Sequence, residues 1–368
     1  MAATDRPSDP DAVAASELAT AIADAPFVRL LARADGASVA AAGLLAAACA
    51  ERSIPFQTSV RPTESLGTEG EESLVVGIGI RSGTSVTLVS EPPTAAYESA
   101  RDLGCDPDPV LAAAGLVADG GDLTAEEGAR LLTDAAIERR PGVGVPTADL
   151  ADGLAHTTLT HTAFSGEETV TGAALAELAD GSPEAVASLL ALATIESEGA
   201  SARAAESVER ALRPHASPTG PVETVEGLAD VLDCVARERP GTALALAMGY
   251  DVRSEALEGW REHAKRAHAA FDAATTGRYD GLFVARIESG PVETVARLVR
   301  DVRSPEPVTL VLAEGEAAAA SVEGHAIREA MNEATVTVGG TASATATRGY
   351  ACYDGESEAF LTAFREAL

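Results

Sequence analysis

The chain has 368 residues, enough for two or three domains, and 46% of them are hydrophobic, which excludes an intrinsically disordered protein. Its 57 Asp and Glu residues outnumber 27 Lys and Arg, so the formal net charge is -30 and no basic nucleic-acid footprint exists at the level of net charge. The acidic residues recur along the whole length and Lys265 is the single lysine, a composition that resembles salt-adapted halophilic proteins.

Cysteine usage and hydropathy exclude further classes. The four cysteines lie far apart and form no Cys-x-x-Cys pair, which disfavours a clustered zinc site and gives no disulfide framework. The first residues are acidic and lack a signal-peptide pattern, and the longest apolar run, residues 39–50, is too short to span a bilayer. We therefore expect a soluble, cytoplasmic protein without a membrane partner.

The first part of the chain predicts a parallel sheet covered by helices. A polar tail and a short helix occupy residues 1–24, and a turn at Asp35-Gly36 separates a strand from an Ala-rich helix. Strand, helix and strand in this rhythm are typical of an α/β domain. The predicted elements are a strand at 27–33, a helix at 37–52, and strands at 54–60, 74–80 and 85–89.

The middle of the chain is predicted to be helical from residue 95 to residue 214. Ser182-Pro183-Glu184 is a good helix start, because Ser is a preferred N-cap and Pro is favoured in the first turn. Residues 215–221 collect turn residues and are the best linker candidate. After them we predict a helix at 222–238, a strand at 242–248 and one long helix at 253–275.

The last part of the chain repeats the α/β rhythm with shorter elements. We predict strands at 281–287, 307–312 and 335–338, helices at 292–302, 325–332 and 357–368, and an alternating antiparallel edge strand within 341–353. A second, smaller α/β domain follows from this pattern.

Several local patterns carry a functional alternative. Gly77-x-Gly79-x-x-x-Gly83 lacks the following helix that a dinucleotide site needs, so a hairpin-like turn is favoured. His156 and His161 do not share a helix face well, which disfavours a metal site. No Gly-x-Ser-x-Gly elbow, P-loop or His-Glu-x-x-His motif supports a serine hydrolase, a P-loop NTPase or a zincin.

The most basic patch in the chain lies on the predicted long helix. Arg261, Lys265 and His268 fall on one face of it, with Trp260 beside them. A solvated helix face is the favoured interpretation, because charge runs usually face water. Contact with a nucleic-acid backbone between the two domains is the alternative.

Two segments carry a family resemblance. Residues 31–38 read Leu-Ala-Arg-Ala-Asp-Gly-Ala-Ser and run into the Ala-rich helix, and Val338-Gly339-Gly340-Thr341 precedes an alternating strand. They resemble the DHH phosphoesterases, which include the RecJ single-strand nucleases. In active members the first segment is His-x-Asp-x-Asp-Gly and the second is a Gly-Gly-Gly-His-like turn. The resemblance extends from about residue 26 to residue 368.

The resemblance implies a site for divalent metal, commonly manganese, but this chain departs from its ligand pattern. The His and first Asp of the first motif correspond to Leu31 and Arg33, and only Asp35 and Gly36 remain. A strand that normally ends in an Asp ligand has Gly77 or Gly79 instead.

The motif that gives the family its name is also absent. Its Asp-His-His positions correspond to Ser90, Glu91 and Pro92, and a later family Asp corresponds to Asp119. Asp35 and Asp119 are thus remnants, and two carboxylates without His cannot make the usual paired-metal site. We expect no metal cofactor, and we assign no residue a catalytic role.

The resemblance also implies a domain plan. It places a polar tail or helix at 1–24, a DHH-like α/β domain at 25–213, a linker and connecting helices at 214–277, and a DHH-associated α/β domain at 278–368. The residues expected to contact nucleic acid are Gly339, Gly340, Thr341, Arg261 and Lys265.

A role in DNA replication or repair follows from the resemblance. Some relatives in archaea and eukaryotes have lost the metal site and serve as structural parts of the replicative helicase, bound to GINS. We therefore expect a catalytically silent scaffold that binds single-stranded nucleic acid weakly, or a partner such as GINS. One alternative is an active single-strand exonuclease or phosphodiesterase, using Mn or Mg at a rebuilt site that includes Asp35, Asp119 and Glu91. Another is a plain α/β ligand-binding protein with a closed apolar pocket.

Overall fold

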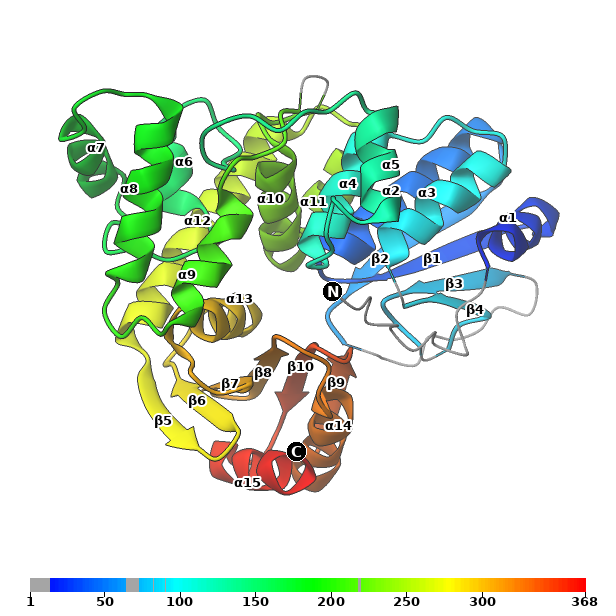
Figure 1. The fold of residues 1–368 in the computed structure, drawn as a ribbon. Coiled ribbons are helices and arrows are strands. Elements are labelled where there is room, and N and C mark those ends of the chain that lie inside the picture. The colour runs from blue at the N-terminus through cyan, green and yellow to red at the C-terminus, as the bar shows by residue number, and fades with distance from the viewer. Residues whose placement is uncertain (1–13, 64–72, 82, 90, 218–219) are drawn as a thin grey trace.

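The computed structural model describes residues 14–63, 73–81, 83–89, 91–217 and 220–368. It confirms the α/β class. A parallel sheet with its helices, a helical region and a second mixed sheet follow one another along the chain (Figure 1). No helix in these described ranges is long and apolar enough to cross a membrane.

The first sheet is formed by four parallel strands in the order β2-β1-β3-β4. They are β1 (Val28–Arg33), β2 (Phe56–Arg61), β3 (Leu74–Ile78) and β4 (Val86–Leu88), close to the predicted positions. A short helix, α1 (Ala15–Asp24), precedes them, and its Leu18 and Ile22 are buried in the first core.

Helix α2 (Gly36–Glu51) fills the centre of this first core. Asp35 caps it by accepting a hydrogen bond from the Ser38 N–H at 2.8 Å. The helix is apolar on all sides, as expected of a helix buried on all sides. Its small residues permit close packing, and a Cβ added to Gly43 would lie 2.7 Å from the carbonyl oxygen of Ala247.

Helices cover this sheet and continue into the helical region. Ser182 caps α8 through the Ala185 N–H, as predicted. Part of the region has a core of its own, which includes Val143, Leu154 and Leu190. The elements are α3 (Pro92–Asp102), α4 (Pro109–Ala118), α5 (Glu126–Asp134), α6 (Leu150–His156), α7 (Glu168–Ala176), α8 (Pro183–Ile195), α9 (Arg203–Ser207) and a 3-10 turn at Val208–Ala211.

Three further helices follow: α10 (Val225–Glu238), α11 (Pro240–Ala247) and α12 (Arg253–Ala273). Helix α10 packs against α2 and α4, so it belongs to the first core. In the segment that the sequence marks as a linker, His215 is buried and its Nδ1 lies 2.7 Å from the Glu226 carboxylate. The strand predicted at 242–248 is wrong, because these residues form α11, with Pro240 in its first turn.

The second sheet is mixed, with the order β5-β6-β7-β8-β10-β9. Its strands are β5 (Thr275–Tyr279), β6 (Leu282–Arg286), β7 (Val308–Ala313), β8 (Glu316–Ser321), β9 (Gly340–Ala344) and β10 (Arg348–Tyr353). Its helices are α13 (Val292–Leu298), which continues as a π-helical turn at Val299–Arg303, α14 (Ile327–Val338) and α15 (Ser357–Ala367). We call this sheet with its helices the C-terminal lobe.

Two predictions for the C-terminal lobe are wrong. The strand predicted at 335–338 is the last turn of α14, and the single edge strand predicted within 341–353 is the antiparallel pair β9 and β10. The sequence analysis did not predict β5 or β8.

Candidate functional site between the lobes

The candidate site lies where β1 of the first sheet ends and α2 begins. In open parallel sheets, ligands bind at the carboxyl ends of the strands. Arg33 is the last residue of β1 and Asp35 is the cap of α2, so both side chains project at this edge.

Arg33 and Asp35 pair with each other. The Arg33 guanidinium donates a hydrogen bond from Nε to the Asp35 carboxylate, and both residues are buried. Burial opposes the charge on each of them. Arg33 and the Ser38 N–H nevertheless hold the pKa of Asp35 below its usual value. Asp35, Glu293 and Asp119 in turn hold the pKa of Arg33 above its usual value. The surviving motif carboxylate is therefore already neutralised by a side chain of the protein.

The glycine after β3 leaves room for this arginine. Gly79 has φ +69°, and a Cβ added to it would lie 2.6 Å from Ser38 Oγ and 3.2 Å from Arg33 Cβ. A longer side chain here would clash with Ser38 and Arg33. An Asp at position 79 would therefore not fit beside Arg33 without movement of its neighbours.

The other positions of the family motifs supply no ligand set. Leu31 lies within β1, Glu91 is the residue before α3, and Pro92 is buried in its first turn. Gly77 is buried in β3, and Ser90 lies outside the described residues.

The rebuilt-site alternative needs Asp35 to share a metal with Asp119 and Glu91. Asp35 instead accepts hydrogen bonds from Arg33 and from the Ser38 N–H, which engage both of its carboxylate oxygens. The structure therefore does not offer Asp35 as a ligand for a metal shared with the other two carboxylates.

A second carboxylate from a distant part of the sequence reaches the start of α2. Asp233 of α10 accepts a hydrogen bond from the Gly36 N–H at 3.0 Å and pairs with Arg237 Nη1 at 2.8 Å. Burial would raise the pKa of Asp233, but the charges of Arg237, Arg348 and Arg297 lower it well below its usual value. The sequence analysis missed Asp233 and Arg237, although their i, i+4 spacing on a helix was a detectable signal for an ion pair.

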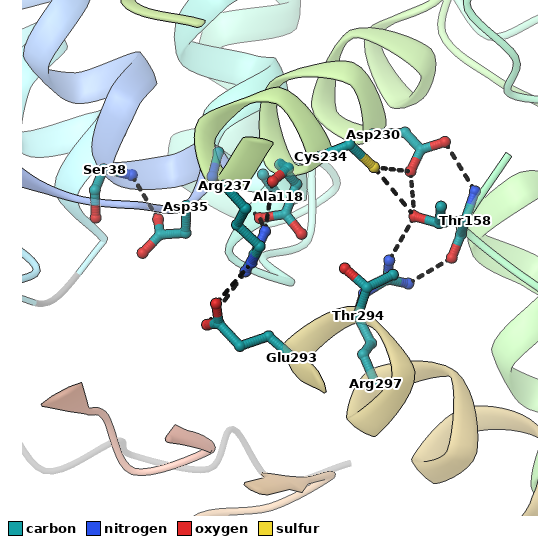
Figure 2. A network of polar contacts seen from close by, with 12 residues as sticks. Asp35, Ser38, Ala118, Thr158, Asp230, Cys234, Arg237, Glu293, Thr294 and Arg297 are labelled. Atoms are coloured by element: carbon teal, nitrogen blue, oxygen red, sulfur yellow. Dashed lines mark hydrogen bonds and ion pairs between the residues drawn. The ribbon is translucent and has the colours of Figure 1, made fainter. Parts of the chain in front are cut away.

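Arginines connect this edge to the C-terminal lobe. Figure 2 shows Arg237 of α10 reaching toward Glu293 of α13, and its Nε lies 2.9 Å from the Glu293 carboxylate. Arg348 of β10 donates to the carbonyl oxygen of Ala118, next to Asp119, at 2.9 Å. The charge of Asp119 raises the pKa of Arg348, although burial lowers it overall.

Helix α13 makes a second connection through Thr158. Arg297 donates to the carbonyl oxygen and the hydroxyl of Thr158, both at 2.8 Å. Thr158 in turn donates to the carboxylate of Asp230 (Figure 2). That carboxylate also accepts a hydrogen bond from Trp260 Nε1 at 2.9 Å. One polar network thus links the C-terminal lobe to α10 and α12.

The space left between these arginines is small. A hollow of about 20 Å³ remains, enough for about one water molecule. Its lining residues are Asp233, Arg237, Glu293, Arg297, Arg300, Ala319, Ala320, Arg348 and Gly349. A nucleotide phosphate does not fit into this hollow without movement of the lobes.

A divalent metal does not fit these residues either. Its ligands would be carboxylates or imidazoles without a competing cation, whereas Asp35 and Asp233 each already pair with an arginine. Within the part of the chain that the structure describes, no group of three or more His, Cys, Asp or Glu side chains could hold a metal ion. The positively charged guanidinium of Arg33 is the cation that pairs with Asp35.

The glycine turn predicted to contact nucleic acid lies at the edge of the second sheet. Gly339 ends α14 with φ +78°, and Gly340 and Thr341 begin β9 with all three residues exposed. The hydroxyl of Thr341 lies 3.3 Å from that of Thr63, so this turn faces the end of the first sheet.

The predicted basic face of α12 is only partly formed. His268 and Trp260 are buried, so neither belongs to an exposed patch. Arg261 donates to both carboxylate oxygens of Asp152, at 2.7 and 2.8 Å, whereas Lys265 is exposed. Arg261 therefore lies in an acidic setting that does not suit a phosphate.

Solved structures share this fold. Exonuclease RecJ bound to manganese matches with a TM-score of 0.52 and 14% identity, over 97% of this chain and 93% of that chain. RecJ in complex with Mn2+ from Thermus thermophilus matches with a TM-score of 0.53 and 14% identity, over 96% of this chain and 53% of that chain. CDC45 from Entamoeba histolytica matches with a TM-score of 0.57 and 8% identity, over 96% of this chain and 98% of that chain. The chain has a RecJ-like fold, as predicted.

Sequence comparison identifies the family. The model of a family described as "Uncharacterized protein rrnAC1427, C-terminal domain" matches residues 274–366. Protein rrnAC1427 of Haloarcula marismortui, also described as uncharacterized, is 49% identical over 378 residues, which cover 100% of both chains. The chain belongs to the rrnAC1427 family.

Proposed function

We propose that this chain is a catalytically silent RecJ-like protein of DNA replication or repair, which acts as a scaffold in the cytoplasm. In this role it binds single-stranded nucleic acid weakly, or a replisome protein such as GINS, and needs no metal cofactor. The observation that carries the proposal is the buried ion pair of Arg33 and Asp35 at the place where the family motif binds metal.

The contacts between the lobes support a scaffold rather than an open enzyme. Arg237 with Glu293, Arg348 with the Ala118 carbonyl, and Arg297 with Thr158 all join the C-terminal lobe to the rest of the chain. Hydrogen bonds in which one partner is charged are the stronger kind, and those in this cleft are shielded from water. Such contacts favour one fixed arrangement of the lobes.

The fold neighbours support the proposed process. The matched structures are described as an exonuclease, RecJ, and as CDC45. The exposed turn at Gly339, Gly340 and Thr341, with Lys265 on α12, remains the proposed contact for a nucleic-acid strand. Arg261 is a weaker candidate because Asp152 already occupies its guanidinium.

The test is degradation of 5′-labelled single-stranded DNA and RNA by the purified chain in molar KCl with MnCl2. We expect no degradation above a protein-free blank, either by the wild type or by Asp35→Ala. Manganese-dependent degradation that Asp35→Ala abolishes would overturn the proposal and favour an enzyme with a rebuilt site. Degradation that persists in Asp35→Ala and stays with the chain through a second purification would also overturn the proposal, whereas degradation lost in that purification comes from a contaminating nuclease.

A further inference from the structure

Three hollows of the helical region form a series in which the middle one shares lining residues with each of the other two. The middle one has a volume of about 720 Å³. It shares Thr147 with a hollow of about 360 Å³ and shares Asp251 and Arg253 with another of about 400 Å³. We call the three together the tripartite groove. It is lined by residues of α4, α6, α7, α8, α10, α11 and α12 and of the loops between them.

The middle hollow is acidic. Four carboxylates line it against two guanidinium groups, those of Arg253 and Arg261. Arg261 is fully engaged by Asp152, and that hydrogen bond, with the nearby charges of Glu168 and Asp149, raises the pKa of Arg261. The lining of the middle hollow therefore has an excess of negative charge, which attracts a cation and repels a phosphate.

Both flanking hollows have apolar side chains in their lining, and the one of about 400 Å³ is also lined by Asp108. The smaller is lined by Val143, Val145, Leu150 and Val186 among others. The other is lined by apolar side chains of three helices and the turn after α11, namely Leu111, Leu228, Leu246 and Tyr250. Tyr250 is 60% exposed, and large exposed side chains of this kind are typical of binding surfaces.

We infer that the tripartite groove binds an extended peptide segment of a partner protein, with a basic side chain in the middle hollow and apolar side chains in the flanking ones. Charge complementarity selects the basic residue, and concentrated salt leaves the burial of the apolar ends effective while it screens charges. A nucleic-acid strand would bring phosphates to the carboxylates. A simple polyamine would leave both apolar ends empty. The inference shares one assumption with the proposed scaffold role, namely that the chain has a protein partner.

The experiment is a selection of peptides from a random library of about twelve residues per member, displayed on their own mRNA, against the full chain in molar KCl. Enriched peptides are then synthesised with a fluorophore and titrated by fluorescence polarisation. We expect a basic centre between apolar residues, and binding weakened about tenfold or more by Asp251→Arg or by Tyr250→Ala. Both side chains are exposed, so these variants should fold, as circular dichroism can verify.

Two matched variants control for charge and for exposed apolar area. Glu329→Arg makes a comparable charge change on α14, and Val336→Ser removes a side chain that is 81% exposed. Neither should change the affinity. The inference is overturned if no peptide is enriched, or if the enriched peptides bind Asp251→Arg and Tyr250→Ala as tightly as the wild type. This outcome is independent of the nuclease assay, so either proposal can fail alone.

Discussion

At the end of β1, an arginine side chain supplies the positive charge that pairs with a buried carboxylate. Asp35 and Asp233 are buried, and a buried carboxylate needs a compensating charge or hydrogen bonds. Arg33 and Arg237 supply that charge here, and the first N–H groups of α2 supply the hydrogen bonds. The arginines therefore explain how the carboxylates persist in a chain that has lost the other family ligands.

The Arg33 and Asp35 pair leads to a stability prediction. Arg33→Leu leaves Asp35 buried without its partner, so we expect a loss of about 3–5 kcal/mol in the free energy of unfolding. The double variant Arg33→Leu with Asp35→Asn should recover most of this loss, because Asn still caps a helix and carries no charge. Denaturant unfolding at one fixed KCl concentration measures both values.

The same pair predicts a dependence on pH. Because the pKa of Asp35 is lowered in the folded state, its contribution is complete above about pH 4 and is lost as the pH falls further. The wild type should thus lose more stability than the double variant over that acidic range. Equal losses in the two proteins, or a single variant as stable as the wild type, would contradict this role of Arg33.

At the scale of elements, a buried histidine joins α12 to the segment that follows α6. His268 Nε2 donates to the carbonyl oxygen of Thr157 at 3.0 Å, and its Nδ1 lies 3.0 Å from Nδ1 of His161. His161 also contacts Asp272 through Nε2, at 3.1 Å. Burial, with the neighbouring His161, lowers the pKa of His268 to about 3.

This histidine predicts loss of stability under mildly acidic conditions. The unfolded chain takes up a proton at this side chain near pH 6.5, but the folded chain does not until about pH 3. The free energy of unfolding should therefore fall by about 1.4 kcal/mol for each pH unit below about 6.5, for this group alone. In His268→Gln, the free energy of unfolding should change less steeply with pH between pH 6 and about pH 4. The difference in slope corresponds to the uptake of one proton. Parallel curves for the two proteins would show that His268 is not buried as a neutral group.

The sequence predicted the first sheet well and the second less well, for physical reasons. Strand β3 reads Leu-Val-Val-Gly-Ile and β2 contains Phe, Thr and Val, all residue types that favour strands. Strand β8 reads Glu-Ala-Ala-Ala-Ala-Ser, and its alanines favour helices, but pairing with β7 and β10 on either side overrides that preference. The prediction for residues 335–338 was wrong in the opposite direction. Their Thr and Val favour strands, yet they continue α14, which packs against α15.

Only those parts of the site whose residues lie within one sequence motif could be predicted. Arg33, Asp35 and Gly79 were recognisable because family motifs fix their spacing. Asp233 reaches Gly36 across 197 positions of sequence, and Arg348 reaches Ala118 across 230. Such contacts depend on how α10 and the C-terminal lobe pack against the first sheet. One sequence carries no local signal for that arrangement.

At the scale of the whole molecule, two electrostatic effects oppose each other. The formal net charge of -30 makes the folded chain repel itself, whereas the arginine contacts between the lobes attract. Screening by salt weakens the repulsion and the attraction to different extents. Exposed charges are screened over about 3 Å at 1 M salt, but buried pairs are screened much less. Salt therefore removes most of the repulsion and little of the attraction.

We accordingly predict that the chain is stabilised by KCl well beyond physiological ionic strength. The melting temperature should rise from about 0.1 M to molar KCl and then level off as screening becomes complete. The control changes six exposed glutamates to glutamine, which lowers the size of the net charge by six: Glu127, Glu177, Glu184, Glu196, Glu329 and Glu333. Because less repulsion remains to be screened, this variant should reach its plateau at a lower KCl concentration. If salt acted only by strengthening the burial of apolar surface, the two curves would have the same shape, and the charge of the chain would not explain its response to salt.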